Sequence, residues 1–250
     1  METQSVMAKE KTVTRKRKTR IAGEASAEGL LKDQAYAEVK RRILEDEFQP
    51  GTFLSERQVS ELLDVSKTPI RAAFQRLELE GFVSISPQQG VVVLDVSMDD
   101  IADHFELRVA LECYVASSLA GNITPEQSAR LAANLDEQRE CVENDDLSRT
   151  VELDGKFHLL LSEFLGNKEI HRVMWQLRDK MYRVIQRVHT RHPERLASNY
   201  PEHRAIADAI LAGDPEKAAE AMEAHLMNGR QILMNPRTRS HVAPYRTRSF

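Results

Sequence analysis

Four residues in the second half of the chain have side chains and spacing suited to binding a metal ion. Asp154 and His158 lie four residues apart in a helical pattern, so both project from one face and can reach one ion. His203 and His225 follow on two later helical segments. One carboxylate and three imidazoles suit zinc, nickel, manganese or iron, with a position open for a ligand or water. Such an Asp-x-x-x-His pair is also common in helices that bind no metal, so spacing alone leaves both interpretations open.

The segments that would position these residues are amphipathic helices joined by short connections. Ser97, Thr124, Asn167 and Asp214 each precede a helical pattern, where a short polar side chain can cap the first turn. Long helices with short loops pack as antiparallel neighbours, so the pattern predicts a helical bundle. The expected helices cover residues 98–121, 124–143, 149–166, 168–189, 198–213 and 214–234.

The N-terminal part of the chain has a different pattern of three helices and a hairpin. A first helix is expected within residues 34–48 and a second within 55–64, opened by a capping box of Ser55 and Gln58. A third helix follows within 66–81, and "FVSIS" and "GVVVLDV" then read as two strands joined by "PQQ". In the second helix we expect Val59, Leu62 and Leu63 to face inward; in the third, Ser66 is the expected cap and Pro69 is tolerated in the first turn. This order is that of a winged helix-turn-helix.

The third helix presents cations opposite its apolar stripe. With Ile70, Phe74 and Leu77 facing inward, the side chains left outside can reach base edges and phosphates. They are Lys67, Thr68, Arg71, Gln75 and Arg76. Arg57 stands near the positive end of the second helix, where a phosphate can approach. Taken singly, each of these charges is more commonly explained by an ordinary solvated helix surface.

Composition narrows the class of protein. With 41 % hydrophobic and 30 % charged residues among 250, and only short apolar runs, no segment can span a bilayer. Cys113 and Cys141 are the only cysteines, which favours two buried thiols in a reducing, cytoplasmic compartment. Residues 1–20 carry seven lysines and arginines against two acids, and residues 230–250 carry five arginines and no acid. These basic ends can attract phosphate, or merely add solubility.

The segment "LSERQVSELLDVSKTPIRAAFQRLELEGFVSISPQQGVVVLDV" resembles the DNA-binding domain of GntR-type bacterial transcription regulators, over about residues 34–96. The resemblance implies contacts with double-stranded operator DNA from the second helix, the third helix and the tip of the wing. The residues at those positions are Arg57, Lys67, Thr68, Arg71, Arg76 and Gly90. Many relatives have Arg where Lys67 stands, so base recognition at this position is expected to differ.

Three further stretches, "ELDGKFHLLL", "YPEHRAI" and "AAEAMEAHL", resemble the all-helical FCD domain of the FadR-type branch, over about residues 98–232. The resemblance implies that Asp154, His158, His203 and His225 bind a divalent metal, zinc foremost. It also implies that Arg108 in "FELRVALE" meets the carboxylate of a small effector. A salt bridge from Arg108 to Glu112, one turn on, is a competing role for this arginine.

The expected fold is mainly α: an N-terminal winged helix-turn-helix followed by an antiparallel α-helical bundle. The expected function is a repressor that binds operator DNA as a homodimer and senses a small organic or sugar acid at a metal site. A metal-dependent hydrolase or lyase, and a sensor of the metal itself, are the alternatives. The expected regions are a basic flexible tail (1–32), the DNA-binding domain (33–96), the ligand-binding and dimerisation domain (97–234) and a basic C-terminal tail (235–250).

Overall fold

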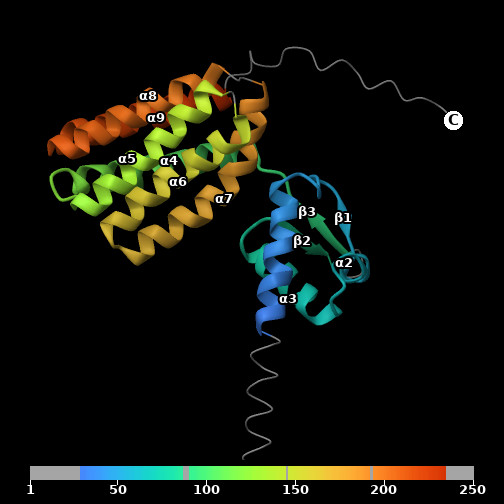
Figure 1. The fold of residues 1–250 in the computed structure, drawn as a ribbon. Coiled ribbons are helices and arrows are strands. Elements are labelled where there is room, and N and C mark those ends of the chain that lie inside the picture. The colour runs from blue at the N-terminus through green and yellow to red at the C-terminus, as the bar shows by residue number, and fades with distance from the viewer. Residues whose placement is uncertain (1–28, 87–89, 145, 192–193, 235–250) are drawn as a thin grey trace, which may run out of the picture. The chain divides into compact units, whose positions relative to one another are not determined.

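The computed structural model describes residues 29–86, 90–144, 146–191 and 194–234 (Figure 1). The chain divides into two compact units, one ending at Asp95 and one beginning at Val96. Most of both predicted basic tails lies outside the described residues. The boundary between the units falls between the last strand and Ser97, the residue that caps the first helix of the second unit.

In its described residues, the first unit combines three helices with a small antiparallel sheet whose strand order is β1-β3-β2. A helix over residues 29–44 is followed by β1 (Phe53–Leu54), α2 (Glu56–Leu63), α3 (Lys67–Leu79), β2 (Val83–Ser86) and β3 (Gly90–Val93). In the sheet, Val92 pairs with Ser84 on one side and with Phe53 on the other. The predicted winged helix-turn-helix is thereby confirmed, with one addition: β1 is too short to produce an alternating sequence pattern.

The core of the first unit confirms the predicted face of α3 and corrects that of α2. Ile70, Phe74 and Leu77 are all buried beneath α3. Val59 is buried under α2, but Leu62 is 52 % exposed, so its predicted inward position is wrong. In so short a helix Val59 and Leu63, four residues apart, define the buried side, and Leu62 lies beside it.

Caps set the starts of α2 and α3 in different ways. Ser55 and Gln58 form the predicted capping box, with the Gln58 backbone N–H donating to Ser55 Oγ at 3.1 Å. Ser66 stands at the N-cap of α3, but its side chain makes no capping hydrogen bond. Pro69, with its fixed φ, is buried in the first turn and helps define where the helix begins.

Gly90 begins β3 with φ +106°, and a Cβ added there would lie 3.1 Å from the backbone oxygen of Leu54. Replacing Gly90 with alanine should lower the free energy of unfolding by about 1–3 kcal/mol, because it adds backbone strain and crowds β1. Chemical denaturation followed by circular dichroism measures the loss. Gly29→Ala is the control, since Gly29 has open space around it. Equal midpoints for the two variants would contradict the prediction.

The second unit consists of six helices in the described residues: α4 (Met98–Leu119), α5 (Pro125–Glu143), α6 (Leu147–Leu165), α7 (Lys168–Arg191), α8 (Glu194–Ala212) and α9 (Pro215–Met234). α4 packs mainly on α9, α8 also packs on α9, and α6 contacts both α5 and α7 (Figure 1). Consecutive helices run back and forth through short connections, which confirms the antiparallel bundle. Cys113 and Cys141 are free and only partly buried, so the expectation of two buried thiols is wrong.

The predicted caps in this unit are present, and two helix starts differ. Ser97 and Thr124 form capping boxes with Asp100 and Gln127. The Asn167 and Asp214 side chains accept hydrogen bonds from backbone N–H groups in the first turns of α7 and α9. α6 begins at Leu147, after the N-cap Asp146, whose side chain accepts from the Arg149 backbone N–H, and α8 begins at Glu194; both starts are earlier than expected. These caps fix the helices that carry the candidate site.

Candidate functional site

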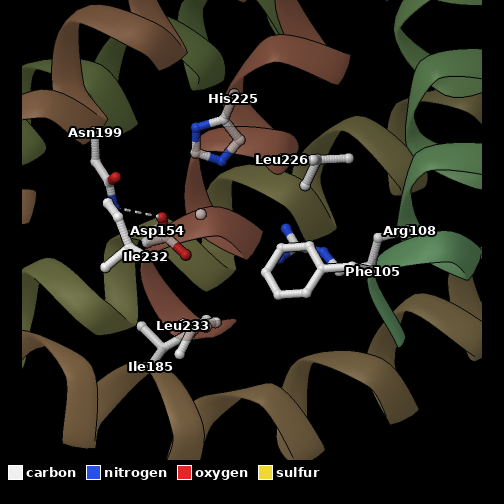
Figure 2. A pocket seen from close by; sticks show the side chains of 10 residues that line it. Phe105, Arg108, Asp154, Ile185, Asn199, His225, Leu226, Ile232 and Leu233 are labelled. Atoms are coloured by element: carbon white, nitrogen blue, oxygen red, sulfur yellow. Dashed lines mark hydrogen bonds between the residues drawn. The ribbon is translucent and has the colours of Figure 1, made fainter. Parts of the chain in front are cut away.

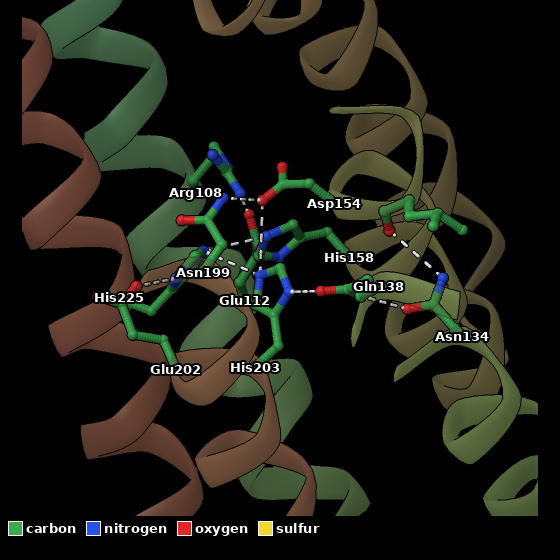
Figure 3. Close-up of polar contacts among 11 residues, drawn as sticks. Arg108, Glu112, Asn134, Gln138, Asp154, His158, Asn199, Glu202, His203 and His225 are labelled. Carbon is green, nitrogen blue, oxygen red and sulfur yellow. Dashed lines mark hydrogen bonds and ion pairs between the residues drawn. The ribbon is translucent and has the colours of Figure 1, made fainter. Parts of the chain in front are cut away.

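Asp154, His158, His203 and His225 come together in the interior of the helical unit (Figure 3). Asp154 and His158 lie on α6, His203 on α8 and His225 on α9. One possible ligand atom from each residue lies within 4.8 Å of those from the others. All four residues are buried, with exposed fractions of 6 % or less. Three helices thus bring together the four candidate ligands named from the sequence.

Two of the histidine rings are oriented by carboxylates at Nδ1. His158 Nδ1 forms an ion-pair contact with the Glu112 carboxylate, and His225 Nδ1 lies 2.7 Å from Glu202 Oε2. An ionised carboxylate can only accept, so each Nδ1 carries the shared proton. When such a ring is neutral, its Nε2 has a free lone pair and can bind a metal.

The orientation of the third ring follows from a chain of buried amides. The backbone oxygen of Leu153 can only accept, and Asn134 Nδ2 donates to it at 3.3 Å. Asn134 Oδ1 therefore accepts from Gln138 Nε2 at 2.7 Å, and Gln138 Oε1 faces His203 Nδ1 at 2.8 Å. An amide oxygen accepts, so the proton of His203 lies on Nδ1. Its Nε2 is left unprotonated in the neutral ring, like those of the other two.

The three Nε2 atoms face one another across short distances. His225 Nε2 lies 3.3 Å from His158 Nε2 and 3.4 Å from His203 Nε2. Asp154 Oδ1 lies 3.6 Å from His203 Nε2 and adds a negative charge. Burial is the main influence on the pKa of His225 and lowers it, although Glu202 opposes the shift, so this ring is favoured as neutral. Facing lone pairs repel, and a divalent cation between them would turn that repulsion into coordination.

Two cavities adjoin this cluster, and Arg108, Asp154 and Ile185 line both. One of them also has Asn199 and His225 at its polar end (Figure 2). Its remaining walls are mainly apolar, formed by Phe105, Leu226, Ile232 and Leu233. The cavity can therefore take a small molecule with one charged end and an apolar body.

Arg108 forms the salt bridge with Glu112 and also lines both cavities. Its Nε donates to Glu112 Oε1 at 2.6 Å, so the predicted salt bridge to Glu112 is present. Burial alone would raise the pKa of the Glu112 carboxyl, but the charges of Arg108 and His158 outweigh burial and hold the pKa at about 2. Among the described residues, the guanidinium of Arg108 donates a hydrogen bond only through Nε. Its terminal amino groups are thus available to a carboxylate in either cavity.

In the first unit, α3 exposes the side chains expected to meet DNA: Lys67, Thr68, Arg71 and Gln75. The Arg71 side chain is 64 % exposed, and its Nε and Nη2 donate to the Glu56 carboxylate at 2.7 and 2.8 Å. Arg57, on α2, is 74 % exposed, with Glu61 at 3.7 Å. Arg71 is therefore paired with Glu56 of α2 through two hydrogen bonds, whereas Arg57 has only a loose contact.

Two other residues expected at DNA have additional structural roles. The guanidinium of Arg76 lies on the Tyr36 ring, 3.5 Å from its centroid, with weak contacts to Asp33 and Glu80 at 3.4 Å. Arg76 thus braces α3 against the helix over residues 29–44. Gly90 begins β3 directly after residues 87–89, which lie outside the described residues. Its lack of a side chain serves the close approach of β1.

Several polar residues of the helical site carried no recognisable motif. Gln138 and Asn134 are four residues apart on α5, a spacing shared by many solvent-facing pairs. Glu202 precedes His203 directly, so it would be expected on another face of α8; it reaches His225 across the helix pair instead. Asn199 lies one turn before His203 and donates to Asp154 Oδ1 at 3.0 Å. That i, i+4 spacing is the one signal that could have indicated it.

Comparison with known families matches both units. Residues 31–93 match the family described as bacterial regulatory proteins, gntR family, and residues 103–228 match the FCD domain. The HTH-type transcriptional repressor RspR of Escherichia coli (strain K12) is 33 % identical over 202 residues, covering 78 % of this chain and 86 % of RspR. The chain belongs to the GntR family. This GntR-family chain has the FCD domain expected of the FadR-type branch.

Other relatives agree with this assignment. The Uxu operon transcriptional regulator of Escherichia coli (strain K12) is 30 % identical, over 79 % of this chain and 84 % of that protein. Escherichia coli McbR/YncC shares the fold, with a TM-score of 0.71 at 22 % identity over 81 % of this chain and 96 % of that structure. RspR and the Uxu operon regulator are named as transcription regulators and not as enzymes. Within the described residues, none of the helices is both long and apolar enough to cross a membrane.

Proposed function

We propose that this transcription regulator is a repressor that binds operator DNA as a homodimer and responds to a small carboxylic acid at a metal centre. The observation that carries the proposal is the orientation of the three histidines. Their Nδ1 atoms face Glu112, Gln138 and Glu202, and their Nε2 atoms converge beside Asp154. A buried set of three imidazole nitrogens and one carboxylate oxygen fits zinc, with nickel, manganese and iron as further candidates.

The effector would bind with its carboxylate at Arg108 and the metal. A bound metal supplies a Lewis-acidic coordination position, and the terminal amino groups of Arg108 supply directed hydrogen bonds. The apolar walls formed by Phe105, Leu226 and Leu233 favour an acid with an apolar body over a polyhydroxylated sugar acid. Asn199 Oδ1 is buried and has no hydrogen-bond partner among the described residues, so a hydroxyl or ammonium group near the carboxylate would gain a bond there.

The DNA would be contacted through α3, with Lys67, Thr68 and Arg71 in the major groove and Arg57 at a phosphate. Arg76 would approach the DNA backbone from its position on the Tyr36 ring. The wing, at whose tip Gly90 is predicted, would reach the neighbouring groove. A homodimer presents two such surfaces related by a two-fold axis, which matches an inverted-repeat operator. RspR is named a repressor, which supports repression rather than activation of transcription by this chain.

The proposal includes the division into tails at residues 1–32 and 235–250 around a DNA-binding region, 33–96, and a sensing region, 97–234. It also places the regulator in the cytoplasm, where its DNA is. Effector and operator would be linked only if the acid binds one arrangement of the dimer better than the other. A sensor of the metal itself is the second candidate, because the ligand set is complete within the chain. In that case chelation alone would release DNA, without any acid.

A thermal-shift screen of small carboxylic and sugar acids tests the effector proposal, on zinc-loaded protein and on protein treated with chelator. At a hundredfold excess over Kd, the right acid should stabilise the loaded protein by about 3 kcal/mol, which is easily seen as a higher Tm. Chelated protein should respond much less. If an acid raises the Tm of both forms equally, the metal is not part of the effector site.

Replacing Arg108 with alanine should abolish most of that acid-dependent shift, because the guanidinium fork is the main cationic partner besides the metal. Arg204→Ala is the matched control: Arg204 also pairs with an acid four residues on, Asp208 at 3.0 Å, but at the surface. The control should respond like the unmodified chain. A full response from the Arg108→Ala protein would place the carboxylate elsewhere.

A further inference from the structure

Glu112 is a buried carboxylate whose two oxygens serve two different parts of the site. Oε1 accepts the hydrogen bond from Arg108 Nε at 2.6 Å, and Oε2 forms the ion-pair contact with His158 Nδ1. Glu112 is 2 % exposed, so solvent does not compete for either oxygen. Figure 3 shows its side chain between Arg108 and His158. The same carboxylate therefore touches the arginine proposed to bind the effector and a histidine proposed to bind the metal.

We propose that Glu112 is a positioning residue shared by the metal centre and the effector site, which makes the geometry of His158 depend on that of Arg108. This inference rests on the proposed metal site. By accepting the Nδ1 proton, Glu112 directs the lone pair of His158 Nε2 toward the other ligands. By accepting from Arg108 Nε, it leaves the terminal amino groups of the guanidinium facing the two cavities.

A neutral amide cannot replace this carboxylate, because it has one accepting atom and one donating group. If the glutamine oxygen of a Glu112→Gln variant accepted from Arg108, its NH₂ group would face His158 Nδ1 and favour the wrong tautomer. If the oxygen accepted from His158, the NH₂ group would face the donor Nε of Arg108. Either orientation breaks one of the two contacts.

Glu202 provides a matched control for these effects. It also holds a ligand histidine, His225, through Nδ1 at 2.7 Å, but its other oxygen accepts from Asn228 at 3.1 Å. Glu202 has no contact with Arg108 among the interactions of the described residues. Glu202→Gln should therefore weaken metal binding independently of Arg108. Glu112→Gln should weaken metal binding by an amount that depends on whether Arg108 is present.

The test measures Zn²⁺ affinity by competition with a chelator for the full chain, Glu112→Gln, Glu202→Gln, and each of the three combined with Arg108→Gln. Each glutamate variant should bind Zn²⁺ about 10–100-fold more weakly. The loss of Zn²⁺ affinity in the double variant Arg108→Gln with Glu112→Gln should differ from the product of the two single losses by about fivefold or more. In the double variant Arg108→Gln with Glu202→Gln, the loss should equal that product within about twofold. Saturating Co²⁺ should give a different visible spectrum in Glu112→Gln, since one imidazole is withdrawn.

The outcomes separate the two proposals. If the unmodified chain binds no Zn²⁺, the proposed metal centre fails. If it binds Zn²⁺ but Glu112→Gln binds equally well with an unchanged Co²⁺ spectrum, or the two arginine combinations behave alike, Glu112 does not have the shared role. Should Glu112→Gln fail to unfold cooperatively, Glu112→Asp replaces it: a carboxylate one methylene shorter cannot reach both partners, and about tenfold weaker Zn²⁺ binding is expected. Unchanged affinity in that variant overturns the inference.

Discussion

Replacing His225 with alanine is expected to lower the affinity of the chain for zinc by about two orders of magnitude or more. The cluster offers four ligand atoms, three of them imidazole nitrogens, within 4.8 Å of one another. Complete four-ligand zinc sites bind with roughly 10–16 kcal/mol, so one lost ligand accounts for a few kcal/mol. His225 is the most informative position, because its Nε2 lies next to those of both other histidines. Competition titration with a chelator of known affinity measures the loss.

His171→Ala is the control for this experiment. His171 belongs to the same helical unit, where its Nδ1 lies 2.8 Å from Ser162 Oγ and its Nε2 accepts from Trp175 at 3.0 Å, but it is not part of the cluster. Its replacement should leave zinc affinity within about twofold of the unmodified chain. A His225→Ala protein that binds one zinc per chain as tightly as this control would show that the cluster is not the metal site.

Replacing Arg71 with alanine is expected to weaken operator binding by about 10–100-fold, the second large effect. Arg71 is exposed on α3, and its guanidinium donates two hydrogen bonds to Glu56. A bidentate contact to a base contributes about 1–3 kcal/mol of discrimination, and a phosphate contact contributes through counterion release. The operator can be selected from random duplexes with the unmodified chain and then used at fixed salt for all variants.

Arg41→Ala is the matched control, because Arg41 is an exposed arginine of the same unit that pairs with Glu38 and Glu47 on and beyond the first helix. Lys40 is a poorer choice: it forms an ion pair with Glu80 at 2.7 Å and its side chain is only 13 % exposed. If Arg71 reads a base, its loss also relaxes the preference at one operator position; if it binds phosphate, the salt dependence becomes shallower instead. Equal losses for Arg71→Ala and Arg41→Ala would refute the assignment of α3 as the recognition helix.

Much of this fold could be predicted from local signals in the sequence. Ser55 and Gln58, or Ser97 and Asp100, mark helix starts through their own chemistry, independent of the rest of the chain. The buried stripe of Ile70, Phe74 and Leu77 follows directly from helical periodicity. Features of this kind depend on residues a turn apart.

Features set by distant contacts could not be predicted in the same way. β1 exists because Leu54 pairs with Val91 across the sheet, and Arg76 is drawn to Tyr36 by the packing of two helices. In the site, the spacing suggests that Asp154 and His158 share a helix face, but the orientation of the histidine rings is set by partners on other helices. Gln138 on α5 is 65 residues from His203, a separation with no sequence signature.

Anomalous X-ray diffraction at the zinc edge, from crystals of the full chain grown with zinc, tests the proposed metal centre most directly. One anomalous peak per chain is expected about 2.0–2.1 Å from Nε2 of His158, His203 and His225, with Asp154 as the fourth protein ligand. No peak at the cluster, with the three rings still facing one another, would contradict the metal centre and with it the proposed sensing of an acid.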